Sequence, residues 1–148
     1  MELRTDKIRA CFDRKIGNFT ELWNLSTNTN YVRCAPRDPL IELYGLKNGE
    51  RVKLSGHISD VAEAPDALIL SYDSFGEYDI SAKVTCRCEQ DRLVFSAEIC
   101  NHSTIDVTEI LMPHLGGIYL GNGQKDYLIY PHHAGDKTED PVYNYAEN

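Results

Sequence analysis

The sequence predicts an all-β fold, an antiparallel β-sandwich of roughly ten short strands. Three observations lead to this prediction. Apolar and polar residues alternate along many short segments, as they do in strands that bury one face and expose the other. These segments recur about every 8–12 residues and are separated by Gly, Asn and Asp, which favour turns. No segment has the apolar period of an amphipathic helix.

The clearest local signal is a β-hairpin. Residues alternate strictly over 83–89 and again over 92–99. Between these two segments, Gln90 and Asp91 fit a two-residue turn. The apolar side chains expected to share one face of the second strand are Leu93, Phe95, Ala97 and Ile99.

The other predicted strands are less regular. They cover residues 7–12, 18–23, 39–44, 50–54, 57–61, 67–74, 107–112 and 127–130. The last two end at Pro113 and Pro131, because proline cannot donate a ladder hydrogen bond. Residues 115–125 contain four glycines and predict a loop. Trp23 lies in an alternating strand, and we expect it in the core.

The length of 148 residues fits a single domain. We expect the sandwich to occupy residues 1–135. Residues 136–148 change in character, from charged to aromatic without an obvious partner strand for the aromatic run. We therefore expect a tail that leads into a downstream domain.

The formal net charge of −8 argues against nucleic acid or an anionic membrane as a partner, since either would require clustered Lys and Arg. No 18-residue apolar stretch and no secretory signal is visible. Five cysteines make an odd number, which favours reduced thiols over a disulfide framework. We expect a cytoplasmic protein.

Two motifs could suggest a metal or a cofactor, but each has a simpler interpretation. Cys86 and Cys88 point to the same face of a strand, and packing as small apolar residues accounts for them. Zinc would require further ligands, commonly on a turn. The glycine-rich residues 116–123 lack the Lys-Ser/Thr ending of a phosphate-binding loop. We expect neither a metal nor a cofactor.

Candidate binding residues lie in two loops. His132 and His133 follow a predicted strand, and a neutral imidazole can hydrogen-bond a sugar hydroxyl. Tyr119 lies in the glycine-rich loop, where its ring could stack on a sugar. We assign no catalytic residue, because no catalytic motif is present. The carboxylates that could lie beside a cleft are those of Glu21, Glu42, Glu77, Glu98 and Glu109.

Two segments resemble the galactose-mutarotase-like supersandwich domain. Residues 8–24, IRACFDRKIGNFTELWN, are similar to its first hairpin. Within residues 93–135, the segments ICNHS (99–103), ILMP (110–113) and YPHHAG (130–135) resemble the same domain in glycoside hydrolase-like proteins related to endo-α-N-acetylgalactosaminidase. There the domain precedes a catalytic (β/α)₈ barrel. The resemblance implies a sandwich that packs against the barrel and helps shape its carbohydrate cleft without supplying catalytic carboxylates.

Three hypotheses on function follow. The first is a non-catalytic N-terminal sandwich of a glycoside hydrolase, whose expected partners are the downstream catalytic domain and a carbohydrate. The second is a free-standing sugar-binding protein or a mutarotase-like aldose epimerase that uses His132 or His133. The third is a free-standing interaction domain whose edge strands pair with another protein.

Overall fold

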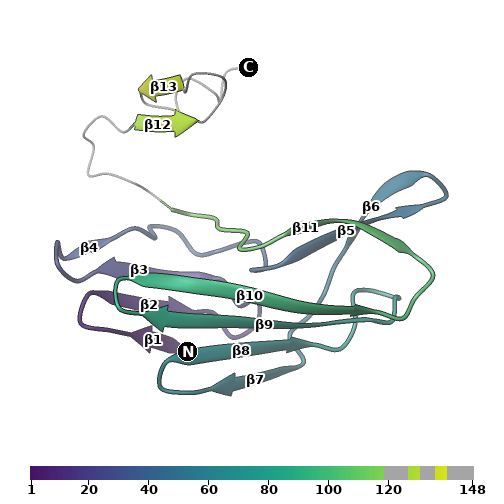
Figure 1. Cartoon of the computed structure of the whole chain (residues 1–148), viewed down its shortest axis with the longest axis horizontal. Coiled ribbons are helices and arrows are strands. Elements are labelled where there is room, and N and C mark those ends of the chain that lie inside the picture. The colour runs from purple at the N-terminus through teal and green to yellow at the C-terminus, as the bar shows by residue number, and fades with distance from the viewer. Residues whose placement is uncertain (119–126, 131–135, 140–148) are drawn as a thin grey trace. The chain divides into compact units, whose positions relative to one another are not determined.

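The computed structural model of the protein describes residues 1–118, 127–130 and 136–139. The chain divides into two compact units, Met1–Ile118 and Tyr119–Asn148. Each unit is described by itself. The described residues are strands, turns and loops without any helix, and every strand pairing is antiparallel (Figure 1). The predicted all-β sandwich is thus confirmed.

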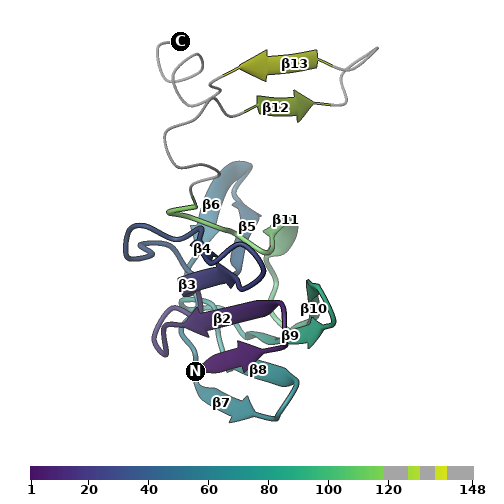
Figure 2. The same cartoon turned by 90° about the vertical axis from the view of Figure 1, so that its left-hand side faces the viewer.

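Three antiparallel sheets build the first unit (Figures 1 and 2). The first has the order β1-β2-β3-β4, the second β10-β9-β8-β7 and the third β11-β5-β6. Figure 1 shows the third sheet at one end of the two larger sheets. The strands are β1 (Glu2–Arg4), β2 (Ile8–Phe12), β3 (Phe19–Asn24), β4 (Thr29–Asn30), β5 (Glu42–Lys47), β6 (Glu50–Leu54), β7 (Asp60–Glu63), β8 (Ala67–Tyr72), β9 (Ile80–Glu89), β10 (Arg92–Asn101) and β11 (Asp106–Leu111).

The predicted hairpin is present as β9 and β10. Its register runs from Arg92 opposite Glu89 to Asn101 opposite Ile80 without a bulge. The two-residue turn is confirmed, and Gln90 adopts a positive φ of 51° there. The long regular pairing explains why strict alternation appears in the sequence, since one face of β9 is buried along its whole length.

Two predicted strands begin later than expected. The strand predicted at 39–44 is β5, Glu42–Lys47, because Leu40 and Ile41 are both buried and the Leu40 amide donates to the Ile16 carbonyl instead of joining a ladder. The strand predicted at 57–61 is β7, Asp60–Glu63. The short strands β1 and β4 were not predicted, since two or three residues carry too little periodicity to detect.

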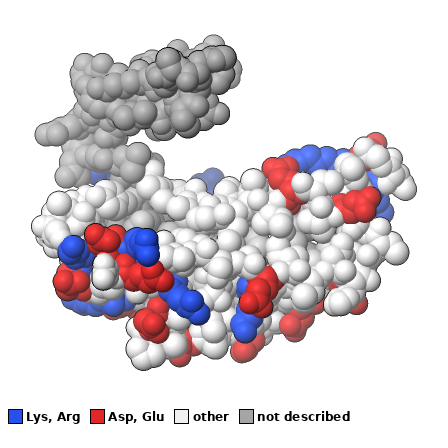
Figure 3. Space-filling model, in the orientation of Figure 1, with Lys and Arg blue, Asp and Glu red and all other residues white. Residues whose placement is uncertain are grey.

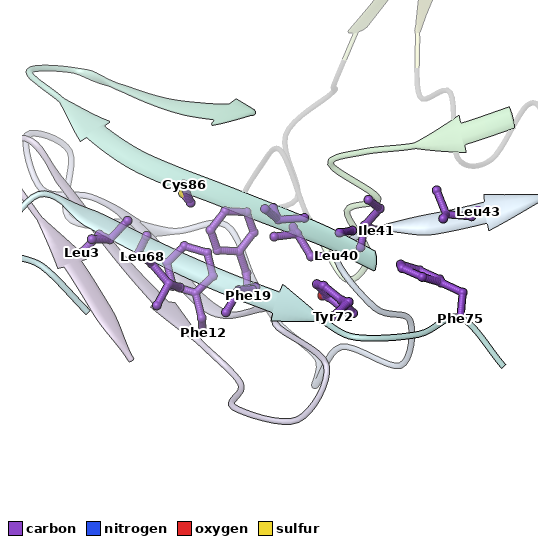
Figure 4. Packing of buried hydrophobic residues seen from close by; sticks show 14 of the residues in the cluster. Leu3, Phe12, Phe19, Leu40, Ile41, Leu43, Leu68, Tyr72, Phe75 and Cys86 are labelled. Carbon is purple, nitrogen blue, oxygen red and sulfur yellow. The ribbon is translucent and has the colours of Figure 1, made fainter. Parts of the chain in front are cut away.

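The core lies between the two larger sheets (Figure 4). Buried residues from the first sheet, such as Phe12 and Phe19, belong to the same cluster as Leu68 and Cys86 from the second. Phe12 and Phe19 have ring centroids 4.8 Å apart. The apolar face of β10 packs against this cluster and is partly buried.

Two predictions about the core have different outcomes. Cys86 and Cys88 are buried among apolar residues, so the predicted packing role is confirmed. Trp23, which we expected in the core, is only partly buried. Its indole N–H donates to a Glu21 carboxylate oxygen at 2.8 Å, so its polar edge is directed to a surface charge.

In the second unit, the structure describes one antiparallel pair. Strand β12 (Tyr127–Tyr130) pairs with β13 (Asp136–Glu139), with Tyr127 opposite Glu139 and Tyr130 opposite Asp136. The predicted strand at 127–130 is confirmed. Residues 136–139, which we placed in the charged tail, form its partner. The boundary at residue 135 lies outside the described residues and stays a prediction.

Candidate functional site

Glu42 lines a cavity with a mixed polar and apolar lining. We call it the Glu42 pocket: it has a volume of about 220 Å³ and is lined by residues 15–16, 37–39, 41–42 and 53–57 together with Tyr72. It therefore lies where the third sheet meets the turn after β2 and the end of β8. Segments that are distant in the sequence must come together to form it.

Glu42 is a buried carboxylate, with 2% of its surface exposed. The alternation of β5 puts its side chain on the same face as Tyr44, and Tyr44 lies opposite Lys53 on β6. Lys53 Nζ donates to Glu42 Oε1 and forms an ion pair with it. Tyr44 donates its hydroxyl to Oε2 at 3.0 Å. The sheet register thus supplies two of the carboxylate's partners.

His114 is the third neighbour of Glu42. Its Nδ1 lies 3.4 Å from Oε1, and this buried nitrogen has no hydrogen-bond partner among the described residues. Burial by itself would raise the pKa of Glu42. The hydrogen bonds from Lys53 and Tyr44 and the nearby His114 outweigh that effect and lower the pKa below 4.5. Glu42 is therefore ionised at neutral pH and acts as a hydrogen-bond acceptor.

Tyr72 contributes the opposite property, a buried donor. Tyr72 has 2% of its surface exposed. Its hydroxyl has no hydrogen-bond partner among the described residues. Burial raises the pKa of Tyr72 to about 12, so the phenol keeps its proton at neutral pH. Its ring stacks on Phe75 at a centroid distance of 5.5 Å. An unpaired buried hydroxyl is costly, and a bound polar group would relieve that cost.

Asn18 holds the loops around the pocket in place. It is fully buried, and its Nδ2 donates to the Asp38 carbonyl at 2.9 Å and to the His114 carbonyl at 2.8 Å. The preceding Gly17 has a φ of 71°, and a Cβ there would lie 2.5 Å from Leu70 Cδ1. Only glycine suits this close approach. The Gly17-Asn18 pair therefore joins the turn after β2 to both loops.

A row of contacts continues along the same face of the third sheet. Arg51 Cζ lies 3.6 Å from the centroid of the Tyr44 ring, which is cation–π geometry. Arg51 also pairs with Glu109 on β11, at 2.8 Å. These contacts fix the ring of Tyr44, and with it the hydroxyl that donates to Glu42.

A second cavity is apolar. We call it the apolar groove: it has a volume of about 420 Å³ and runs between strands β2 and β3 on one side and β10 on the other. Polar residues such as Lys7, Asp91 and Arg92 also line it. Its apolar lining consists of Ile8, Phe19, Leu22, Leu93, Phe95 and Leu115.

The predicted site residues have different outcomes in the structure. Tyr119, His132 and His133 lie outside the described residues. Among the five carboxylates that could lie beside a cleft, only Glu42 is buried. A signal for it was present in the sequence, because a charged residue directly follows the apolar pair Leu40-Ile41 and precedes Leu43. Burial of a charge in such a run indicates a paired side chain.

The described part of the chain contains no group of three or more His, Cys, Asp or Glu placed to hold a metal ion. Nor does it contain a helix with the length and apolarity to cross a membrane. On the face shown in Figure 3, acidic and basic side chains lie next to each other, and uncharged residues separate two such groups. This face offers a polar ligand a mixed surface without a stripe of one sign. Comparisons of the chain with protein-family models, curated proteins and solved structures find no significant match.

Proposed function

We propose that this chain is a non-catalytic β-sandwich domain of a carbohydrate-processing protein and that the Glu42 pocket contacts a sugar. In this proposal the domain packs against a downstream catalytic domain of a glycoside hydrolase and helps shape its cleft. The similarity of residues 8–24 and 93–135 to supersandwich domains supports the domain's role. The all-β sandwich is compatible with it.

The single observation behind the sugar contact is the pairing of two groups in one pocket. Glu42 is an ionised acceptor, and the Tyr72 hydroxyl is a buried donor without a partner. A sugar hydroxyl both donates and accepts, so the hydroxyls of one sugar offer partners of both kinds. The volume of about 220 Å³ lies below that of drug-sized ligand pockets, which favours one sugar ring over a longer chain.

The state of Glu42 argues against a role as a general acid and is compatible with a binding role. A general acid needs a raised pKa so that it carries a proton near neutral pH. The pKa of Glu42 is lowered, and its oxygens already accept hydrogen bonds from Lys53 and Tyr44. It can orient a hydroxyl, but it would not protonate a leaving group.

Titration with simple methyl glycosides, followed by protein-detected NMR, tests the sugar contact. We expect shifts of the residues around the Glu42 pocket with at least one glycoside. The variant Tyr72→Phe removes only the hydroxyl, and we expect it to weaken binding by about 5- to 10-fold. The matched control Tyr78→Phe removes a hydroxyl outside the pocket and should leave affinity unchanged. Absence of binding at about 100 mM glycoside would contradict the proposal.

The domain's role has a separate test. We expect the parent reading frame to encode a (β/α)₈ pattern after this segment, with alternating strands and helices. A co-expressed downstream segment should then bind the sandwich. A reading frame without such a pattern would count against the role in a glycoside hydrolase while leaving the sugar contact open to its own test.

A further inference from the structure

Strand β10 is an edge of the second sheet. It is ten residues long, and it pairs with β9 but with no other strand of the described residues. In a hairpin with a two-residue turn, the residues that flank the turn exchange hydrogen bonds. Arg92 and every second residue after it therefore direct their backbone groups to β9. The backbone N–H and C=O groups of Leu93, Phe95, Ala97 and Ile99 point away from it.

Such an edge can template the pairing of another strand. Natural proteins commonly blunt long edges with proline, bulges or clustered charge. Strand β10 has no proline, and its pairing with β9 has no bulge. The face of β10 that points away from the core carries two charges, Arg92 near one end of the strand and Glu98 near the other. These two charges are opposite in sign, which makes the edge complementary to itself.

We propose that β10 pairs antiparallel with β10 of a second copy of this chain, in the register centred on Phe95. In this register Leu93 faces Ala97 of the second copy, and Arg92 faces Glu98 of the second copy. The two-fold symmetry repeats each contact. No other register of the two strands brings Arg92 opposite Glu98.

The backbone groups and the charged side chains of β10 both fit this register. The outward backbone groups of Leu93, Phe95 and Ala97 become the hydrogen-bonded positions. Arg92 and Glu98 then form non-hydrogen-bonded pairs, in which side chains approach more closely. Among the described residues Glu98 has no ion-pair partner. Arg92 pairs with Glu89 at 2.9 Å through one nitrogen, and its guanidinium has further donors.

The apolar groove supplies a second reason for a second copy. Leu93 and Phe95 line the groove from its β10 side. When two sheets join edge to edge around a two-fold axis, the same face of β10 lies on the same side in both copies. The second copy's Phe95 is then placed next to the first, where it extends the apolar lining and covers part of the groove.

The test is sedimentation velocity of the full chain from about 1 µM to about 1 mM. We expect a reversible dimer at the upper concentrations. The charge reversals Arg92→Glu and Glu98→Arg should each weaken dimerisation by about 10- to 100-fold, because each creates two like-charge pairs between the copies. Each reversal also faces a like charge on β9 of its own chain, Glu89 or Lys83. The combined variant Arg92→Glu/Glu98→Arg should restore it. Asp60→Lys, on edge strand β7 at the far side of the same sheet, is the matched control and should leave dimerisation unchanged.

A second variant tests the backbone pairing. Ala97→Pro removes an outward N–H without removing a hydrogen bond to β9, and we expect it to abolish the dimer. Circular dichroism should show that each variant keeps the wild-type β-sheet spectrum. A chain that stays monomeric over the whole range overturns the proposal, as does a dimer that withstands both Ala97→Pro and Arg92→Glu. The sugar contact at the Glu42 pocket uses other residues, so it can fail or succeed independently.

Discussion

The side chain of Asn18 donates a hydrogen bond to the backbone carbonyl of His114, 2.8 Å away and 96 residues later in the chain. The same amide nitrogen donates to the Asp38 carbonyl. One buried side chain thus connects the turn after β2 to the loop before β5 and to the segment after β11. These are the loops that place His114 beside Glu42 and Asp38 in the lining of the Glu42 pocket.

Replacement of Asn18 should therefore destabilise the whole first unit. We expect Asn18→Ala to lower the free energy of unfolding by about 2–4 kcal/mol, because two partly buried hydrogen bonds from the fully buried Asn18 side chain are lost. Urea unfolding followed by fluorescence of Trp23 measures it. Thr20→Ala, at an exposed position on β3, should change stability by less than about 0.5 kcal/mol. Equal stability of Asn18→Ala and the wild type would show that the Asn18 contacts are dispensable.

The Glu42 ion pair should make stability depend on pH. Because the pKa of Glu42 is lower in the folded chain than the ordinary 4.5, its ionised form favours folding above that pH. The contribution should be lost as the pH falls through the folded-state pKa. We expect Glu42→Gln to cost about 1–3 kcal/mol at pH 7 and the difference from wild type to shrink below pH 4.5.

Urea unfolding at a series of pH values between about 3 and 7 checks the Glu42 prediction. Glu77→Gln is the matched control, since Glu77 also pairs with a lysine, Lys47, but its side chain is 69% exposed. Exposed pairs contribute little, so this variant should follow the wild-type profile. A Glu42→Gln difference that stays constant down to pH 3 would rule out titration of Glu42 as the cause.

Gly56 should not tolerate a side chain. A Cβ at Gly56 would lie 2.6 Å from the ring of Phe75, which is fully buried. We expect Gly56→Ala to cost about 1–3 kcal/mol through overpacking. A Cβ at Gly116 would meet nothing within 4 Å, so Gly116→Ala serves as the control. Thermal unfolding of the two variants side by side measures the contrast, which would vanish if Phe75 could move aside at no cost.

The cysteines should differ in reactivity. Burial raises the pKa of Cys86 to about 12, and thiolates are the reactive species. Cys34 and Cys100 are exposed. We expect iodoacetamide at pH 8 to label the exposed pair in the folded chain, whereas Cys86 should be labelled only after unfolding. Peptide mass spectrometry assigns the sites. Rapid labelling of Cys86 under native conditions would contradict its place in the core.

Parts of the fold could be predicted because their cause is local. In β9 and β10 the strict alternation comes from one buried face, and the turn at Gln90 and Asp91 sets the register over ten residue pairs. Strand β6 also has its predicted bounds, residues 50–54. By contrast, β5 begins three residues later than predicted, because the buried residues Leu40 and Ile41 belong to a loop held by Ile16.

The sequence by itself determined the all-β class and the main hairpin of this protein, since both follow from periodicity and short turns. The apolar residues on both sides of Glu42 indicate a buried charge, but only the tertiary structure decided which groups pair with it. Its partners Lys53 and His114 come from β6 and from the segment after β11, and Asn18 brings that segment into place. The unpaired hydroxyl of Tyr72 likewise depends on which groups surround it. Such contacts join residues that are far apart in the chain, and no local pattern encodes them.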